Sequence, residues 1–160
     1  MKQRNLSQVE IYQKLMRYCA YQDRCSTDIV KKIKLWQLDD KVIENALSYL
    51  KEEGFVDDLR FAKSFVRGKF RSNKWGRAKI REALYAKQIQ KEFVEEAMKE
   101  LDEEKYDEQL LNLLIKKNRL LKEEDIYKRK QKLALYVQSK GYEMNLIWEA
   151  IKKINLKISD

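Results

Sequence analysis

The sequence contains no proline, no histidine and only four glycines in 160 residues. All-β folds need turn residues in quantity, so this shortage argues against them. The lack of histidine removes the usual general base, the usual catalytic triad and most zinc sites. Charged residues make up 38% of the chain, as in amphipathic helices with solvated outer faces. The composition therefore favours an all-α protein.

Cysteines and long apolar runs are also scarce. Cys19 and Cys25 lie six residues apart, and no further thiol or imidazole could complete a metal site with them. We expect them to be reduced, partly buried side chains of a cytoplasmic protein. No apolar run reaches the roughly 20 residues of a membrane span, and no signal-type apolar segment follows the first residues. Without a glycine-rich phosphate loop either, we predict a non-catalytic protein with no cofactor, no metal and no membrane partner.

One sequence pattern occurs three times, in residues 39–50, 90–101 and 143–154. Each copy has apolar residues at the same four positions around a fixed alanine. These alanines are Ala46, Ala97 and Ala150. They are 51 and then 53 residues apart, which is close to the periods of repeat proteins. The pattern indicates one helical unit used three times. Function is then expected on an extended surface rather than in one pocket.

The similarity continues before each copy, where apolar residues recur at three- and four-residue steps. Each unit is therefore expected to hold three helices. The predicted helices are residues 7–21, 26–36, 39–53, 57–72, 76–87, 90–103, 106–119, 124–140 and 143–156. The sequence thus predicts three tandem three-helix repeats, residues 1–55, 56–104 and 105–160, that form an elongated, curved array of right-handed helices. Helix caps are expected at residues 26–28, at either Asp39 or Asp40, and at Asp57 and Asp58.

Positive charge is concentrated in the middle repeat. The whole chain has a net charge of +9, and residues 58–90 hold ten basic and two acidic side chains. Like charges at three- and four-residue spacing repel each other, so a bound polyanion would relieve them. A solvated face is the alternative interpretation. The candidate polyanion-binding residues are Lys63, Arg67, Arg71, Lys74, Arg77, Lys79, Arg81 and Lys87.

The loop between the first two helices of this repeat adds two hypotheses. Trp75 could stack on a base, or it could equally pack under the loop. A backbone N–H after Gly76 could meet a phosphate at the start of the next helix. A second, weaker basic cluster covers residues 128–132 and is preceded by residues 116–119.

Residues 54–66 contain a glycine-hydrophobic turn that leads into an Asp-Asp-x-x-Phe-Ala helix, and residues 75–89 form a basic stretch that ends in Lys-Gln-Ile. The chain resembles the RecX family in these segments, and more weakly over all three units. Trp75 stands where the family often has lysine, and Ala83 where it commonly has glutamate. Gln88 replaces a customary glycine, which argues against a tight left-handed turn there.

The resemblance implies a protein of three three-helix repeats that binds the RecA recombinase and its nucleoprotein filament. It also implies weak, non-specific contact with DNA and inhibition of filament extension, ATP turnover and strand exchange. Such a protein would modulate DNA repair, recombination and the SOS response. End-capping, groove occupation and active removal of the recombinase all remain open as mechanisms. We expect a monomer.

Two other function classes stay open from the residues themselves. A helical regulator could bind DNA directly, although the basic helices offer few asparagine or glutamine side chains to read base edges. A structural adaptor could pack its helices against an unrelated partner.

Overall fold

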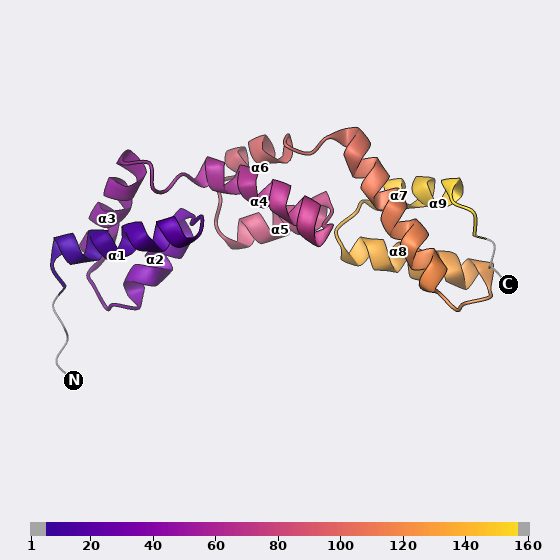
Figure 1. Cartoon of the computed structure of the whole chain (residues 1–160), viewed down its shortest axis with the longest axis horizontal. Helices are drawn as coiled ribbons and strands as arrows, with labels where there is room; N and C mark the ends of the chain where they lie inside the picture. The colour runs from indigo at the N-terminus through magenta and orange to yellow at the C-terminus, as the bar shows by residue number, and fades with distance from the viewer. Residues whose placement is uncertain (1–5, 157–160) are drawn as a thin grey trace.

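The structure is a computed structural model that describes residues 6–156. The described residues form nine α-helices and no strand, as the sequence predicts. The first unit consists of α1 (Gln8–Tyr21), α2 (Ser26–Lys34) and α3 (Asp40–Glu52); the second of α4 (Asp58–Asn73), α5 (Arg77–Ala86) and α6 (Lys91–Met98); and the third of α7 (Glu103–Leu120), α8 (Ile126–Ser139) and α9 (Met144–Lys153). Figure 1 shows the three groups following one another along the molecule.

The repeated sequence pattern forms the last helix of each unit. Its alanine is buried in every copy, with 0%, 0% and 7% of its surface exposed at Ala46, Ala97 and Ala150. A small side chain at this position lets the third helix lie close to the other two, and the flanking apolar residues fill the space beside it. The periodic positions Ile29 and Ile33 are likewise fully buried on α2.

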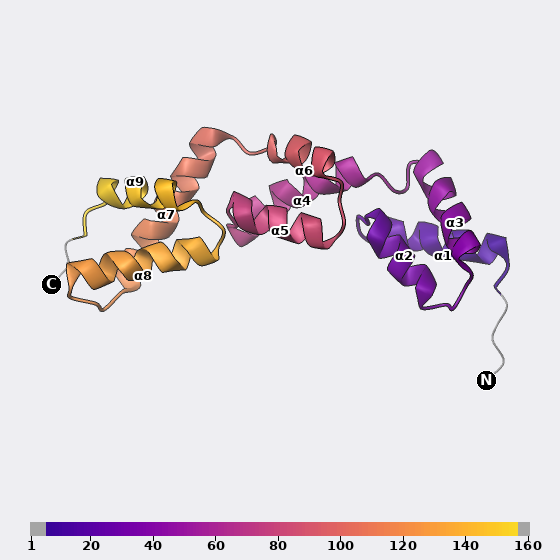
Figure 2. The same cartoon turned by 180° about the vertical axis from the view of Figure 1, so that it is seen from behind.

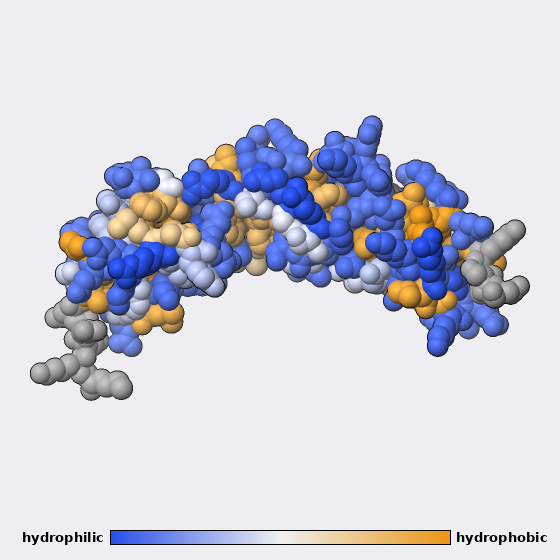
Figure 3. Space-filling model, viewed as in Figure 1, coloured by the Kyte–Doolittle hydropathy of each residue, from blue (hydrophilic) through white to orange (hydrophobic). Residues whose placement is uncertain are grey.

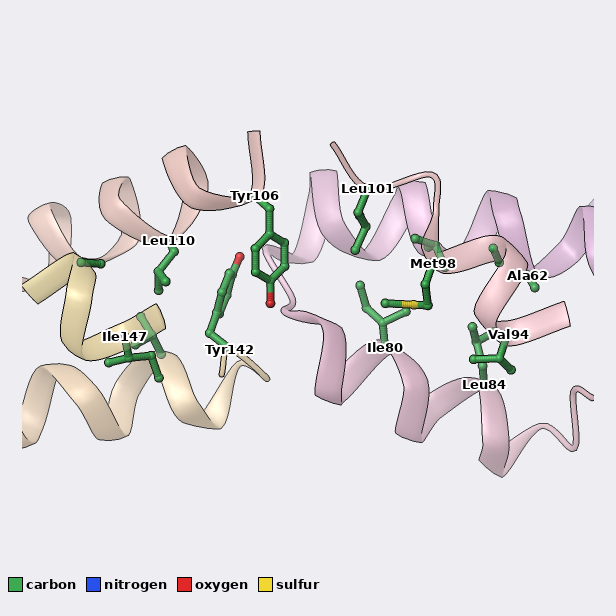
Figure 4. Packing of buried hydrophobic residues seen from close by; sticks show 14 of the residues in the cluster. Ala62, Ile80, Leu84, Val94, Met98, Leu101, Tyr106, Leu110, Tyr142 and Ile147 are labelled. Carbon is green, nitrogen blue, oxygen red and sulfur yellow. The ribbon is translucent and has the colours of Figure 1, made fainter. Parts of the chain in front are cut away.

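The hydrophobic core is divided unevenly among the units. The first unit has a core of its own, centred on residues such as Leu15, Ile29 and Leu50. The second and third units share one continuous core, in which Tyr106 and Tyr142 bridge the two sets of helices (Figure 4). Cys25 is the residue of the first unit that belongs to this shared core. The second and third units are therefore joined by apolar packing, and the first is attached mainly through the start of α2.

The three units form a curved rod rather than a ball. The views from front and back agree that the first and third units lie at opposite ends, with the second between them (Figures 1 and 2). The space-filling view shows the same bow, with apolar patches scattered over a largely hydrophilic surface (Figure 3). None of the helices in the described part of the chain is long and apolar enough to cross a membrane.

Some helix boundaries differ from the predicted ones. α6 ends at Met98 rather than at residue 103, and α7 begins at Glu103 rather than at residue 106. Asp102 explains the early start, because its side chain accepts a hydrogen bond from the Lys105 N–H at 2.9 Å. Val56 packs in the core of the first unit, although the predicted second repeat begins with it.

Helix capping at the start of α2 agrees with the prediction for Asp28 but not for residues 26 and 27. The cap position is Cys25, whose N–H donates to the Asp28 carboxylate at 3.1 Å, and residues 26 and 27 bond to the next unit instead. Asp57 caps its own helix as expected, by accepting from the Arg60 N–H at 3.0 Å. Asp58 accepts from the Ser26 N–H at 2.7 Å, so it caps α2 of the preceding unit.

The expectation against a left-handed turn at Gln88 is wrong. Gln88 has φ 58°, and the equivalent positions Gln37 and Gly141 have φ 56° and φ 98°. All three lie between the second and third helix of their unit, where the chain reverses within a few residues. The turn geometry is thus set by the repeat, and in two units a glutamine adopts it despite the steric cost.

Candidate functional site

A groove of about 420 Å³ lies between α4 of the second unit and α7 of the third. Its lining residues are Arg67, Phe70, Arg71, Lys74, Glu100, Leu101, Asp102, Lys105, Glu108, Gln109, Asn112, Leu113 and Lys116. Five of these side chains are basic and three are acidic, and Phe70, Leu101 and Leu113 supply an apolar part. The groove exists only because two repeats meet, so neither repeat alone contains it.

The second unit contributes the basic side chains at the end of α4. Arg67 and Arg71 lie one helical turn apart, on the side of α4 that faces away from buried Val66. Lys74 ends the helix in a left-handed conformation with φ 61°. Its carbonyl oxygen accepts a hydrogen bond from the Tyr142 hydroxyl at 3.1 Å, which ties the loop to the third unit.

The third unit contributes Lys105 and Lys116 from α7. These two lysines are absent from the main predicted cluster, because they are more than thirty residues from Arg71 in the sequence. Lys116 belongs to the weaker predicted cluster, but nothing in the sequence places it beside α4. Only the packing of the second unit against the third brings the two groups together.

Most cations of the groove are free of ion pairs. Arg67 is 3.2 Å from Glu100, with 49% of the Arg67 side chain exposed. Arg71, Lys74, Lys105 and Lys116 make no ion pair with any carboxylate in the described part of the chain. A surface pair such as that of Arg67 contributes little to stability and is easily exchanged for another anion. The groove therefore offers positive charge that the fold itself does not neutralise.

Lys63 extends this basic line toward the start of α4. It lies one turn before Arg67, in a shallow depression of about 410 Å³ that both share with Asp57, Leu59 and Arg60. We call Lys63, Arg67, Arg71 and Lys74, together with Lys105 and Lys116, the groove surface.

Arg77 lies at the junction of the second and third units rather than on the groove surface. Its guanidinium is 2.7 Å from Glu103 and 3.5 Å from Glu143, and it lies over the Tyr106 ring at 3.9 Å from the centroid. Burial opposes its charge, but the two carboxylates prevail and raise the pKa of Arg77. Only 16% of its side chain is exposed. Arg77 thus serves as a clamp between units.

The hypothesis of a phosphate site after Gly76 is wrong, because the third unit already uses these donors. The Gly76 N–H donates to the Lys140 carbonyl at 2.7 Å, and the Ala78 N–H to the Gly141 carbonyl at 3.0 Å. The Arg77 N–H donates to the Tyr106 hydroxyl at 3.0 Å, and that hydroxyl lies 3.0 Å from Glu143. Burial raises the pKa of Tyr106, so its hydroxyl stays protonated and can donate to Glu143.

The remaining predicted cations also have partners within the protein. Arg81 pairs with Glu95 at 3.1 Å, and Lys87 pairs with Asp28 of the first unit at 3.2 Å. Lys79 lies 4.9 Å from the Trp75 ring centroid. The eight predicted residues are therefore not brought together on one surface. Lys63, Arg67, Arg71 and Lys74 follow one side of α4, and the other four support the fold or its junctions.

Of the two interpretations of Trp75, stacking on a base or packing under the loop, the structure agrees with packing. Trp75 is half-buried against the shared core, and Lys69 and Lys79 each place an ammonium 4.9 Å from its ring. The weaker cluster is also not a single surface. Arg129 is buried, with 3% of its surface exposed, and Lys132 pairs with Glu123 at 2.8 Å.

Comparison with known families identifies the repeats. Residues 57–98 match the family model described as the second three-helix domain of RecX, and residues 103–151 match the model of its third three-helix domain. The chain belongs to the RecX family. The two matches coincide closely with α4–α6 and α7–α9.

Related sequences agree with this assignment. The chain is 35% identical over 129 residues to the regulatory protein RecX of Clostridium beijerinckii, covering 79% of this chain and 60% of the relative. It is 37% identical over 132 residues to that of Clostridium botulinum strain Eklund 17B, covering 81% and 61%. The regulatory protein RecX of Chlorobium phaeobacteroides is 27% identical, covering 87% and 89%. The chain thus spans about three fifths of the length of the two clostridial relatives.

Solved structures have the same architecture. A crystal structure of a regulatory protein RecX superposes with a TM-score of 0.83 at 26% identity, over 91% of this chain and 72% of the other. The RecX structure from Lactobacillus salivarius gives a TM-score of 0.84 at 19% identity, over 91% and 95%, which shows the shared fold.

Proposed function

We propose that this chain binds the RecA recombinase and its nucleoprotein filament, and that it inhibits filament extension, ATP turnover and strand exchange. It would act as a non-catalytic, monomeric regulator of DNA repair and recombination in the cytoplasm. Its relatives are named regulatory proteins. Among the described residues, no group of histidine, cysteine, aspartate and glutamate side chains could hold a metal ion. The observation that carries the proposal is a basic groove that lies between two units of an elongated rod (Figure 1).

The shape suits a ligand that is itself repetitive. A curved rod of three units can touch successive subunits of a filament, whereas a compact domain of the same size would touch fewer. Contacts that are weak one by one then add through effective concentration. Positive charge at the middle of the rod favours a filament that carries single-stranded DNA.

The groove surface is the proposed contact. Its unpaired cations, above all Arg71, Lys74 and Lys105, can meet phosphates or carboxylates without breaking an internal ion pair. Arginine offers a planar fork to such groups and lysine a mobile point charge, so the contact attracts and positions without reading bases.

A charge-matched pair of variants tests the proposal. One variant carries Arg71→Ala, Lys74→Ala and Lys105→Ala, and its control carries Lys41→Ala, Lys51→Ala and Lys152→Ala at exposed positions outside the groove. Both lose three positive charges. We expect the groove variant to inhibit ATP turnover by RecA on single-stranded DNA at least about tenfold less well, since charge-assisted contacts contribute about 1.5–3 kcal/mol each. Equal losses in the two variants would show that only net charge matters.

Direct action on nucleic acid is the second candidate, and the unpaired cations of the groove surface favour it. If about five phosphates on a single strand were neutralised, log affinity against log salt would have a slope of about −3.5. Titration of fluorescent single-stranded DNA at several salt concentrations measures this slope. A slope near zero would assign the groove surface to protein contacts instead.

A further inference from the structure

The first unit has a second basic site, separate from the groove surface. A depression of about 370 Å³ on α1 and α2 is lined by Lys14, Arg17, Tyr18, Lys32 and Trp36. Three of these side chains are cationic, two are aromatic, and no carboxylate takes part. Here we call these five residues the first-unit site.

The two aromatic rings are held by the fold. Tyr18 and Trp36 are half-buried and pack against the core of the first unit. Cations lie over both rings, with the Lys14 ammonium 5.7 Å from the Trp36 centroid and the Lys32 ammonium 5.1 Å from the Tyr18 centroid. The Arg24 guanidinium lies on Tyr18 at 3.8 Å. The aromatic rings of Tyr18 and Trp36 thus lie next to cationic side chains and are held in place by the core.

Lys14 and Lys32 contact aromatic rings of the fold, but the charges of this site are not paired with carboxylates. Lys14, Arg17 and Lys32 make no ion pair with any carboxylate among residues 6–156. Lys14 and Arg17 are also one turn apart on α1, where like charges repel. The cations at the unit junctions behave differently, since Arg77 and Lys87 each have a carboxylate partner. Basic side chains without carboxylate partners, beside half-buried aromatic rings, are the combination that favours an anionic ligand from outside.

We propose that the first-unit site binds single-stranded nucleic acid, with a base stacked against Trp36 and phosphates on Lys14, Arg17 and Lys32. Bases stack on aromatic side chains irrespective of sequence, and a basic surface follows the backbone. An acidic peptide would satisfy the cations but would bring no flat ring to the tryptophan. The proposal does not rest on RecA, because it concerns the free protein and a free strand.

Trp36 fluorescence reports on the site directly. The full chain has three tryptophans, so Trp75→Phe and Trp148→Phe leave Trp36 as the single tryptophan, whose emission is read by excitation at a wavelength that tyrosine does not absorb. The probes are a 12-nucleotide oligo-dT and an abasic strand with the same number of phosphates. We expect oligo-dT to quench Trp36 and to bind about 5- to 160-fold more tightly than the abasic strand, which is the range for one stacked base. Equal affinity for the two strands with no change at Trp36 would overturn the proposal.

Charge variants on the same background separate the site from general attraction. Lys14→Ala with Arg17→Ala should weaken oligo-dT binding about tenfold, whereas Lys41→Ala with Lys51→Ala, on exposed positions of α3, should change it less than twofold. Far-UV circular dichroism shows that each variant is folded. Trp36→Leu keeps an apolar side chain against the core and should abolish the preference for oligo-dT over the abasic strand. Tight binding of poly-glutamate that quenches Trp36 as strongly as oligo-dT would show a site for acidic chains and refute stacking.

The outcome is independent of the filament proposal. The groove variant should keep Trp36 quenching by oligo-dT while it loses inhibition of RecA. A first-unit variant that loses quenching but still inhibits RecA would support the assignment of two separate surfaces. Loss of quenching in the groove variant alone would place the strand on the groove and overturn the first-unit site.

Discussion

Replacing Gly141 by alanine should separate the second unit from the third. A Cβ at Gly141 would lie 2.5 Å from the Lys79 nitrogen and 2.6 Å from the Lys79 Cβ, and the glycine has φ 98°. The opposing atoms belong to the start of α5, so they cannot move aside as a flexible side chain could. The clash is relieved only if the two units move apart, and that movement breaks the hydrogen bonds from Gly76 to Lys140 and from Ala78 to Gly141.

The expected loss has two parts. An alanine in the left-handed region costs about 1–2 kcal/mol, and the smaller freedom of the unfolded chain returns about 0.4–1 kcal/mol. The two broken backbone hydrogen bonds add about 1 kcal/mol each. Gly141→Ala should therefore lower the free energy of unfolding by about 3 kcal/mol, as guanidinium denaturation would measure it. Small-angle scattering should show a larger radius of gyration.

Gly54→Ala is the matched control. Gly54 also has a left-handed backbone, with φ 77°, but a Cβ there would meet nothing within 4 Å. Gly54→Ala should carry the backbone cost alone, about 1 kcal/mol or less, with unchanged scattering. Equal destabilisation of the two variants, or unchanged scattering of Gly141→Ala, would refute the argument that close backbone approach joins these units.

Three smaller changes address other features. Gln88→Gly should raise the free energy of unfolding by about 0.5 kcal/mol, because the strain that glycine removes at φ 58° outweighs the freedom that it adds to the unfolded chain. A lower free energy of unfolding in guanidinium denaturation would contradict this. Burial opposes ionisation of Asp28, but its hydrogen bonds to Cys25 and the charge of Lys87 prevail and lower its pKa from 3.8. The contribution of ionised Asp28 to the stability of the fold is therefore present above about pH 4 and is lost as the pH falls through the lowered pKa. Asp28→Asn should be less stable at pH 7, and a difference that persisted at pH 2 would contradict the cause. Arg129→Ala should lower the free energy of unfolding by about 2–4 kcal/mol, because the guanidinium donates to the Leu121 and Glu123 carbonyls and to Asn118. An unchanged melting temperature would refute this.

The helices and their grouping into repeats could be predicted because they depend on local periodicity. Ala46, Ala97 and Ala150 indicate the repeat directly, and the apolar residues around them are buried or half-buried, as the pattern requires. The turn at Gln88 could not be predicted in the same way. Its left-handed backbone follows from how the second and third helices pack, and the side chain itself disfavours it.

The candidate site could be predicted only in part. Arg67 and Arg71 share one side of α4 because helical spacing alone places them there. Whether a cation is free or paired depends on the neighbouring unit, and the sequence gives no sign that Arg77 meets Glu103 and Glu143. The sequence likewise gives no sign that Lys105 lies in the groove, because only the packing of the third unit against the second brings it there.

The sequence by itself determined nine helices, a three-fold repeat and an excess of positive charge in the middle unit, because spacing and composition act over a few residues. Only the tertiary structure decided which of those charges remain available. At each junction the start of one unit's second helix is bonded by the next unit, and this contact neutralises some basic side chains and leaves others facing a groove.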